Sequence, residues 1–426
     1  MRRAKNIFDN IDSISVLLYA LLVLFGIVNI YASQFNDDTS FALDISSRYG
    51  KQILFAGVSA FVAFIIVIID WKFFYSLTYL FYIIVVLLLI GVLFQGAITG
   101  GASSWFELGS FKFQPSEFAK FATALAVAKY YNNIHSKKIS LQDKLKTYGV
   151  IILPFLLIIL QNDLGTALVY TAFILVLYRE GLSGNVLIFG LVIGVLFVLA
   201  LLVEQIQLIS ILGGITILLF LLSRKKKNEI IALSGILIAS VAFILSVNYI
   251  FDNFLAPHHQ VRIEILLGKK IEAHGAGYNL IQSKIAIGSG GLAGKGFLNG
   301  TQTRFDFVPE QSTDFIFCTI GEEWGFLGSA FVVILYMAFL LRLLFVAERQ
   351  RSIFSKLYGY GVASIFFFHI AINIAMTIGL APVIGIPLPF ISYGGSNLMV
   401  TFVLIGLILN VFRNWGGPVL PRSREL

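Results

Sequence analysis

The chain has 426 residues, of which 58% are hydrophobic and only 13% are charged. Soluble globular domains carry roughly a quarter of charged residues, so this composition excludes an ordinary soluble protein and predicts an all-α polytopic membrane protein. The net charge of +8 does not indicate nucleic-acid binding, because the cations cluster in short loops between apolar runs, as orientation in a membrane requires. The single cysteine, Cys318, excludes an intramolecular disulfide and a cysteine zinc cluster.

Apolar segments divide the chain into about twelve candidate transmembrane helices, several of them shorter than the roughly 20 residues that span a bilayer. They fall at 14–32, 52–70, 73–95, 115–131, 147–160, 164–180, 185–203, 206–222, 229–250, 315–345, 358–379 and 395–412. The first segment lacks a convincing small-residue cleavage site, so we expect a retained span rather than a signal peptide. The whole chain, 1–426, is predicted to be a single integral membrane domain.

The distribution of Lys and Arg orients these spans. Cations are most frequent near the N-terminus and in 135–146, 224–227, 342–356 and 413–424. Twelve spans place all of these on one side, which the positive-inside rule assigns to the cytoplasm. Both termini are therefore expected in the cytoplasm, and the motif-like stretches fall on the outer face.

The outer segment 251–314 is too long for a simple connection. Its glycines between 288 and 296 allow close backbone approach, so we expect a large ordered extracytoplasmic loop with short helices over a cavity. Asp314 ends this polar segment where an apolar run begins. Glu322 and Glu323 follow about 12 to 13 Å deeper at the helical rise, where ionisable groups usually face a cavity or a partner.

The segment QPSEFAK predicts a helix that begins at Pro115. Glu117 and Lys120 lie three residues apart, on one face of that helix. Two interpretations remain open. The residues form an ion pair at the membrane interface, or Lys120 neutralises a phosphate or pairs with Glu323 as structural support.

Two further outer motifs also allow a structural and a functional interpretation. In QNDLGTA, Asp163 is either an acidic N-cap or a functional carboxylate. The segment 378–397 contains three prolines and four glycines, which exclude one continuous helix. It forms either a wall of the site, with Ser392 and Ser396 as hydroxyl donors, or a purely structural corner.

Four cations lie in the outer loop, where the positive-inside rule predicts few. They are Arg262, Lys284, Lys295 and Arg304. They suit an anionic headgroup such as pyrophosphate, or else they form a solvated basic face. His258 and His259 have no partners at metal-ligand spacing, so no metal site is predicted from them.

Several of these motifs resemble those of one known family. GTQTRFDFVPEQSTDFIF, QPSEFAK, QNDLGTA and GIPLPFISYGGS are similar to motifs of the SEDS (shape, elongation, division and sporulation) proteins, and GKGFLNGTQ resembles the RodA elongation branch more than the FtsW division branch. The similarity runs from about residue 52 to residue 412, with the motifs in the family's order.

The resemblance implies a peptidoglycan glycosyltransferase in the bacterial cytoplasmic (inner) membrane. Such an enzyme polymerises lipid II and works with a class B penicillin-binding protein that crosslinks the strands. No cofactor is firmly implied, and a divalent cation, Mg²⁺ or Mn²⁺, is an open alternative.

The resemblance also assigns residues. It makes Asp314 the essential acid and matches Asp306 to a nearby acidic position. Glu117, Lys120 and Arg262 carry over as further family positions, and Glu310 is an additional candidate for positioning the sugar or a cation.

The chain departs from the family pattern in three places. Asn162 stands where the family usually has proline, which leaves the helix start less rigid. The stretch 206–250 adds a pair of spans to the usual ten-helix core. Asn397 replaces a common serine after YGGS.

The implied reaction is attack of a GlcNAc 4-hydroxyl on the anomeric carbon of a MurNAc that carries polyprenyl pyrophosphate. A single inverting displacement needs a base on the acceptor and neutralisation of the leaving group. We expect Asp314 to be the base, and Lys120 and Arg262 to stabilise pyrophosphate. Two alternatives remain: a flippase for lipid-linked precursors, which needs recognition groups on both faces, and a non-catalytic scaffold for a penicillin-binding protein.

Overall fold

The computed structural model describes residues 11–35, 46–99, 102–108, 111–134, 140–222, 227–253, 255, 257–269 and 276–413. The chain divides into two compact units. The first contains residues 1–176 and 278–426, and the second contains residues 177–277. The predicted extra pair, 206–250, falls within the second unit.

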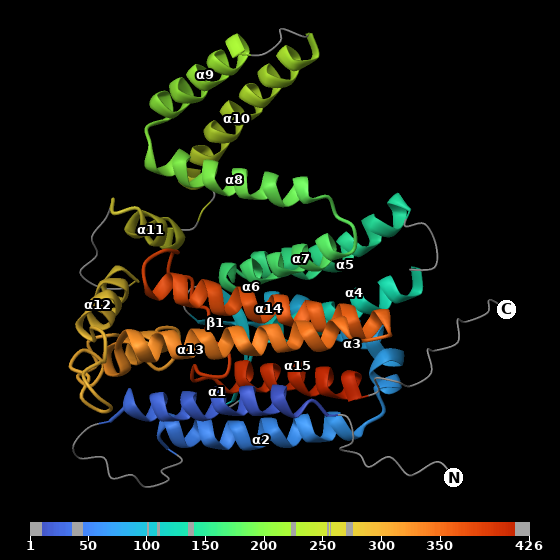
Figure 1. The fold of residues 1–426 in the computed structure, drawn as a ribbon, viewed down its shortest axis with the longest axis vertical. Helices are drawn as coiled ribbons and strands as arrows, with labels where there is room; N and C mark the ends of the chain where they lie inside the picture. Colours follow the sequence, from blue (N-terminus) through green and yellow to red (C-terminus); the bar gives the residue numbers. More distant parts are fainter. Residues whose placement is uncertain are drawn as a thin grey trace, which may run out of the picture. The chain divides into compact units, whose positions relative to one another are not determined.

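Helices make up nearly all of the regular structure of the first unit (Figure 1). In chain order they are α1 (Ser13–Ala32), α2 (Arg48–Ile68), α3 (Trp71–Gln95), α4 (Pro115–Ile134), α5 (Leu141–Leu160), α6 (Leu164–Val169), η1 (Tyr170–Ala172), α7 (Phe173–Arg179), α12 (Ala276–Ser289), α13 (Ile316–Glu348), α14 (Ile353–Thr377) and α15 (Gly395–Arg413). Helix α7 continues into the second unit, and α12 begins just before the boundary.

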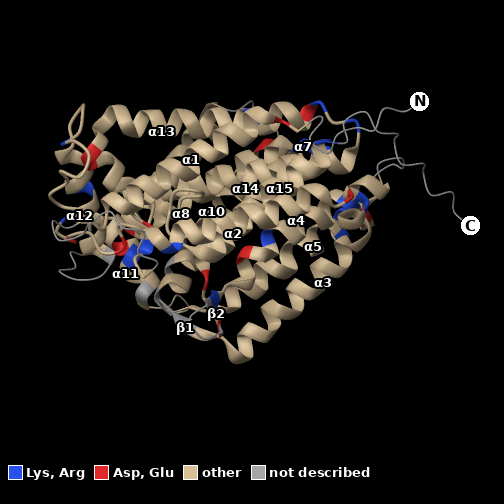
Figure 2. Ribbon diagram, turned by 90° about the horizontal axis from the view of Figure 1, so that it is seen from below, with Lys and Arg blue, Asp and Glu red and all other residues tan. Residues whose placement is uncertain are grey.

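Nine helices within the described ranges are long and apolar enough to cross a membrane. Helices α4 and α5 and the run from α6 to α7 occupy the three remaining predicted spans, so each of the twelve positions carries helix. Most of the ribbon of the long helices bears neither Lys or Arg nor Asp or Glu (Figure 2). This is the architecture of a multi-pass α-helical membrane protein, while the count of twelve crossings stays a prediction.

Short polar side chains begin many of the helices, as N-cap chemistry requires. Asp12, Ser47, Asp70, Ser140 and Ser352 each accept a hydrogen bond from a backbone N–H in the first turn of α1, α2, α3, α5 and α14, respectively. The predicted start of α4 at Pro115 is confirmed.

The interior of the first unit lies around α4, α14 and α15. In an apolar stretch of 18 residues from each helix, 83% of the residues are buried in α15 and 67% in α14, but only 22% in α2 and in α3. Helix α15 packs against α2, while α14 packs against α4 and α13. The site motifs at the ends of these central helices are therefore held on the most extensively packed elements.

A small three-stranded sheet lies between residues 97 and 113, where no strand is expected from the sequence. Its strands are β1 (Ala97–Thr99), β2 (Ala102–Leu108) and β3 (Phe111–Phe113), and they pair antiparallel in the order β1–β2–β3. The backbone N–H of Ser103 donates to the carbonyl of Gln161, which ties the sheet to the end of α5.

The second unit contains α8 (Gly184–Leu202), α9 (Gln205–Leu222), α10 (Lys227–Asn253) and α11 (Pro257–Leu266). Helix α10 packs on both α8 and α9, around a small core that includes Leu201, Leu208 and Ile244. Helices α11 and α12 are short helices of the kind expected in 251–314.

Helix α13 is interrupted at Gly325, whose φ of 63° lies outside the helical region. The carbonyls of Glu322 and Glu323 would otherwise accept from the N–H groups four residues on, at Phe326 and Leu327. Instead, they accept from the N–H groups of 295 and 296, while Phe326 and Leu327 donate to the carbonyls of 291 and 292. The loop 291–296 thus supplies the partners that two hydrogen bonds of a continuous helix would otherwise provide, and these backbone groups stay hydrogen-bonded.

Candidate active site

The backbone around Asp314 is fixed by three consecutive carbonyl groups. Each accepts a hydrogen bond from the proline-rich segment 378–394 or from α14. The three pairs are Tyr393 N to Ser312 O at 2.8 Å, Ser392 Oγ to Thr313 O at 2.6 Å, and Asn373 Nδ2 to Asp314 O at 2.8 Å. The predicted acid therefore lies where two irregular segments meet, just before α13 begins.

Ser392 links the two segments. Its hydroxyl donates to Thr313 and accepts from the N–H of Leu388 at 2.7 Å. Gln52 of α2 contacts the same turn at two points. Its side-chain amide donates to Ser392 O and accepts from Gly394 N, both at 3.2 Å. These contacts confirm that 378–394 is not one continuous helix and give Ser392 a structural contact.

Gly385 borders the Asp314 carboxylate. A Cβ atom at this position would lie 3.3 Å from Asp314 Oδ2, and the φ of Gly385 is +72°. Residues other than glycine rarely adopt this backbone conformation. Glycine at 385 thus satisfies both the local turn and the close approach to the carboxylate, and Asp314 remains partly exposed.

Arg48 is a cation near this site that the sequence analysis missed. Its Nη1 donates to Ser312 Oγ at 2.6 Å, two residues before Asp314. Arg48 is exposed at the first turn of α2. The available sequence signal was an arginine on the predicted outer face, where the positive-inside rule expects few cations.

Glu117 and Lys120 form an ion pair, as expected, and the pair is buried within the protein. Lys120 Nζ lies 2.6 Å from Glu117 Oε1 and 2.7 Å from His369 Nε2 of α14, and Lys120 is only 1% exposed. The ammonium can donate to His369 only if Nε2 carries no proton. The alternative in which Lys120 pairs with Glu323 is wrong, because α4 and α14 supply its partners.

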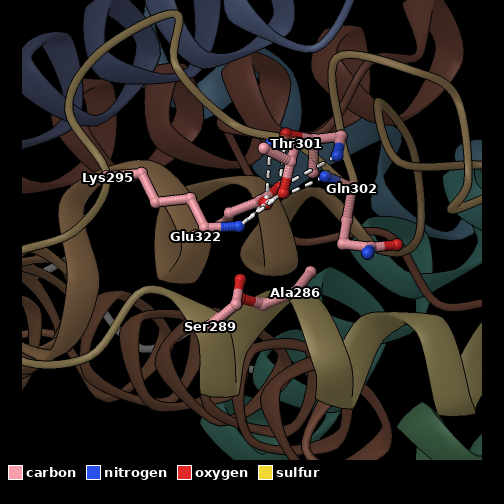
Figure 3. A network of polar contacts seen from close by, with 7 residues as sticks. Ala286, Ser289, Lys295, Thr301, Gln302 and Glu322 are labelled. Carbon is pink, nitrogen blue, oxygen red and sulfur yellow. Dashed lines mark hydrogen bonds and ion pairs between the residues drawn. The ribbon is translucent and has the colours of Figure 1, made fainter.

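Lys295 pairs with a buried carboxylate. Its Nζ lies 2.6 Å from Glu322 Oε1 and 2.6 Å from Thr301 Oγ1 (Figure 3). Glu322 is fully buried and also accepts from the backbone N–H groups of Thr301, Gln302 and Thr303 at 2.8 to 2.9 Å. Glu322 thus has a partner, as expected of a buried carboxylate, and that partner is Lys295. Together, these hydrogen bonds to Glu322 anchor the loop 295–303 to α13.

Glu323 has a different environment from its neighbour. It is 2% exposed, and its Oε2 has no hydrogen-bond partner. Its backbone carbonyl accepts from Gly296, and a Cβ at Gly294 would lie 2.1 Å from that carbonyl oxygen. Glycine is thus required where the loop meets α13, and structural support by Glu323 stays a prediction.

Asp306 and Glu310 lie on the exposed loop that leads to Asp314. Asp306 Oδ1 accepts from Gln311 Nε2 at 2.7 Å, and Glu310 Oε2 accepts from Thr313 Oγ1 at 2.7 Å. The guanidinium of Arg304 lies 5.6 Å from the ring centroid of Phe35, a cation–π distance. Arg304, Asp306 and Glu310 thus belong to the loop that ends at Asp314.

The remaining predicted residues have local roles or lie elsewhere. Asp163 caps α6 through Thr166 N at 2.9 Å and accepts from Gln114 Nε2 at 2.9 Å, as the N-cap interpretation predicts. Ser396 Oγ donates to Lys112 O at 2.8 Å. Arg262 lies on α11 in the second unit.

Asn162, which replaces the family's usual proline, adopts a φ of +59°. Proline is locked near −65°, so this backbone conformation excludes the proline that Asn162 replaces. Asn397 is buried, and its Nδ2 has no hydrogen-bond partner.

The site thus contains the partly exposed carboxylate of Asp314 on a backbone held by hydrogen bonds. The exposed guanidinium of Arg48 is bonded to Ser312, two residues before Asp314. A base needs this combination of access and fixed position. Among the described residues, no group of three or more His, Cys, Asp or Glu is placed to hold a metal ion.

Comparisons with known proteins identify the family of this chain. A family model described as cell cycle protein, covering FtsW, RodA and SpoVE, matches residues 12–213 and 197–415. The peptidoglycan glycosyltransferase RodA of Treponema pallidum is 34% identical over 96% of this chain and 99% of its own length. The peptidoglycan glycosyltransferase MrdB of Escherichia coli is 36% identical over 78% of this chain and 76% of its own length.

Solved structures extend the likeness to the fold. A structure described as "Structural coordination of polymerization and crosslinking by a peptidoglycan synthase complex" matches with a TM-score of 0.71 and 26% identity, over 96% of this chain and 99% of that chain. The rod shape determining protein RodA of Thermus thermophilus matches with a TM-score of 0.63 and 25% identity, over 96% and 98% of the two chains. The chain belongs to the FtsW, RodA and SpoVE family of cell cycle proteins.

Proposed function

We propose that this protein is a peptidoglycan glycosyltransferase that polymerises lipid II into glycan strands during cell-wall elongation. The names of the RodA and MrdB relatives support the activity. The observation that carries the assignment of the base is the position of Asp314, whose backbone is fixed by α14 and the segment 378–394 while its side chain stays partly exposed.

In this mechanism, Asp314 accepts the proton of the acceptor GlcNAc 4-hydroxyl. The hydroxyl oxygen attacks the anomeric carbon of the donor MurNAc as the bond from that carbon to pyrophosphate breaks. The bonding electrons leave with polyprenyl pyrophosphate, and the α linkage becomes a β linkage. A fixed carboxylate favours this step because the reacting groups need no further alignment.

The leaving pyrophosphate needs positive charge. Arg48 joins Arg262, Arg304 and Lys120 as a candidate for this role. Arg48 is exposed and contacts the Asp314 loop through Ser312. Lys120 is enclosed by Glu117 and His369, so direct contact with a phosphate requires that cluster to open, and the charge of Lys295 is already offset by Glu322.

Asp306, Glu310, Ser392 and Ser396 are retained as candidates for binding the sugar or its peptide. A divalent cation, Mg²⁺ or Mn²⁺, bound to the pyrophosphate would add further neutralisation. The protein works in the inner membrane with both termini in the cytoplasm, alongside a class B penicillin-binding protein. The structure matched above, whose description names a peptidoglycan synthase complex, supports this partner.

The test is polymerisation of purified lipid II by the protein, alone and with its cognate penicillin-binding protein, comparing wild type with Asp314→Ala. Glycan strands from wild type only are the expected result. If neither protein makes strands but both move lipid II across liposome membranes, the flippase alternative replaces the polymerase.

A further inference from the structure

Helix α14 carries a buried polar row on one face. His369, Asn373 and Thr377 recur every four residues, a spacing that places them on the same side of a helix. They are 4%, 0% and 0% exposed, respectively. His369 contacts the Glu117–Lys120 pair, and Asn373 contacts the Asp314 backbone, so this face of α14 is in contact with both groups of predicted site residues.

Asn373 uses both hydrogens of its amide. One bond runs to Asp314 O at 2.8 Å, and the other runs to Ile386 O at 2.6 Å. A side-chain amide has only two N–H donors. A single side chain thus joins the segment before α13 to the segment after α14.

These two carbonyls flank the candidate base. One belongs to Asp314 itself, and the other belongs to the residue after Gly385, where a Cβ would lie 3.3 Å from Asp314 Oδ2. The spacing between the carboxylate and the wall beside it therefore depends on the Asn373 amide. Without the amide, two carbonyls lose a donor inside a membrane protein, where lost hydrogen bonds are costly.

We propose that Asn373 is a positioning residue that sets the location of the Asp314 carboxylate for proton abstraction. This inference rests on the proposed function of Asp314 as the base. Asn373 touches no reacting atom. It acts by holding the backbone of Asp314 and the segment beside its carboxylate, and a displacement of about 1 Å at such a position can cost about a hundredfold in rate.

Asn410 of α15 provides a matched control. It is also 0% exposed, and its Nδ2 contacts three carbonyls, Ile66 O at 2.6 Å, Ile69 O at 2.5 Å and, at the longer distance of 3.4 Å, Val67 O. Those carbonyls lie at the C-terminal end of α2, whereas Arg48, which contacts the Asp314 loop, lies at its N-terminal end. Twenty-one residues of helix place these ends about 30 Å apart. Asn410 thus has the same chemistry and burial at a distance from the site.

The experiment compares Asn373→Ala and Asn373→Ser with Asn410→Ala and Asn410→Ser in the full-length protein. Thermal unfolding and lipid II polymerisation are measured, with kcat and apparent KM determined separately. We expect a similar loss of stability at both positions. Only Asn373→Ala should lower kcat by about tenfold to a hundredfold with apparent KM nearly unchanged, and Asn373→Ser, which retains one donor, should recover part of that loss.

Two results separate the inference from the function on which it rests. If Asp314→Asn is inactive while Asn373→Ala has the kcat of Asn410→Ala, Asn373 does not position the base. If Asp314→Asn is as active as wild type, the assignment of the base itself is wrong. Should Asn373→Ala fail to fold, the kcat of Asn373→Ser relative to that of Asn410→Ser decides the same question.

Discussion

Asp314 and Glu322 lie eight residues apart and place two carboxylates in different environments near the start of α13. At Asp314, the hydrogen bonds described above hold the backbone, and the residue is partly exposed. At Glu322, three backbone N–H groups, two hydroxyls and Lys295 all converge on the carboxylate, which is fully buried.

The difference separates access from anchoring. A carboxylate whose oxygens are saturated by donors has little capacity left to accept a proton, because those bonds favour its charged form. A partly exposed carboxylate such as that of Asp314 can be reached by a substrate. Depth in the membrane, which first draws attention to Glu322 and Glu323, does not distinguish an anchoring carboxylate from an accessible one.

The largest expected effect in this comparison is on catalysis at Asp314. Replacement by Asn preserves the size and the backbone contacts but removes the base. We expect Asp314→Asn to lower the polymerisation rate by about a hundredfold to ten-thousandfold, the usual contribution of a general base, with an unchanged melting temperature. A rate near that of wild type would show that another group accepts the proton.

Glu322 should give the opposite pattern. Glu322→Ala leaves several buried donors and Lys295 without their acceptor, and breaking a buried pair in this way costs about 3 to 5 kcal/mol. The activity of each folded molecule should fall less than in Asp314→Asn. The control is Glu107→Ala, which breaks an exposed pair with Lys112 and should cost about 0 to 1 kcal/mol; equal melting temperatures for the two variants would contradict the anchoring role.

Gly385 allows the wall beside Asp314 to be tested. Gly385→Ala places a methyl group 3.3 Å from the carboxylate at a φ of +72°, and the backbone strain alone should cost about 1 to 2 kcal/mol. Gly268→Ala has a similar φ of +70° and open space around its Cβ. We expect both variants to lose stability and only Gly385→Ala to lose kcat, as measured by polymerisation and thermal unfolding. If kcat falls equally in both variants, strain rather than proximity is the cause.

The smallest expected effect is on stability, at Asp12. This residue is the N-cap of α1 and forms an ion pair with Arg342 of α13. Burial disfavours its charge, but hydrogen bonds from Arg342 and Ser15 outweigh that effect and lower its pKa from the usual 3.8. Because the folded-state pKa is the lower one, the stabilisation is present above about pH 4 and is lost as the pH falls through the folded-state value.

Comparison with Asp12→Asn measures this contribution. Wild type should be more stable by about 1 kcal/mol or less near pH 6, and the difference should shrink when both proteins are unfolded thermally near pH 3. A difference that grows on acidification would reverse the assigned sign of the pKa shift.

The sequence predicted the helical segments and several local contacts because their signals are local. Apolar run length fixes a span, Pro115 begins α4, and the prolines near 382–389 exclude a continuous helix. The three-residue spacing of Glu117 and Lys120 places them on one face, so their pairing follows from helix geometry. Motif resemblance directed attention to Asp314, next to the segment that holds it.

Long-range partners were beyond the reach of local patterns. Nothing near Asn373 indicates that its amide spans two loops, and Arg48 is separated from its partner Ser312 by 264 positions. Lys120 was given the alternative partner Glu323 because charge complementarity alone does not distinguish among distant carboxylates. The small sheet was missed because two of its three strands, β1 and β3, have only three residues and carry too little alternation to detect.

The exchange of hydrogen bonds at Gly325 has a consequence for motion. Undocking the loop 291–296 releases two carbonyls and two N–H groups on α13, and these are the groups that an unbroken helix would pair with each other. If Gly325 returns to helical angles, these four groups pair with each other in two hydrogen bonds within α13, and only the loop loses its partners. The helix and the loop therefore compete for the same groups, and the start of α13 has two alternative ways to keep its backbone paired.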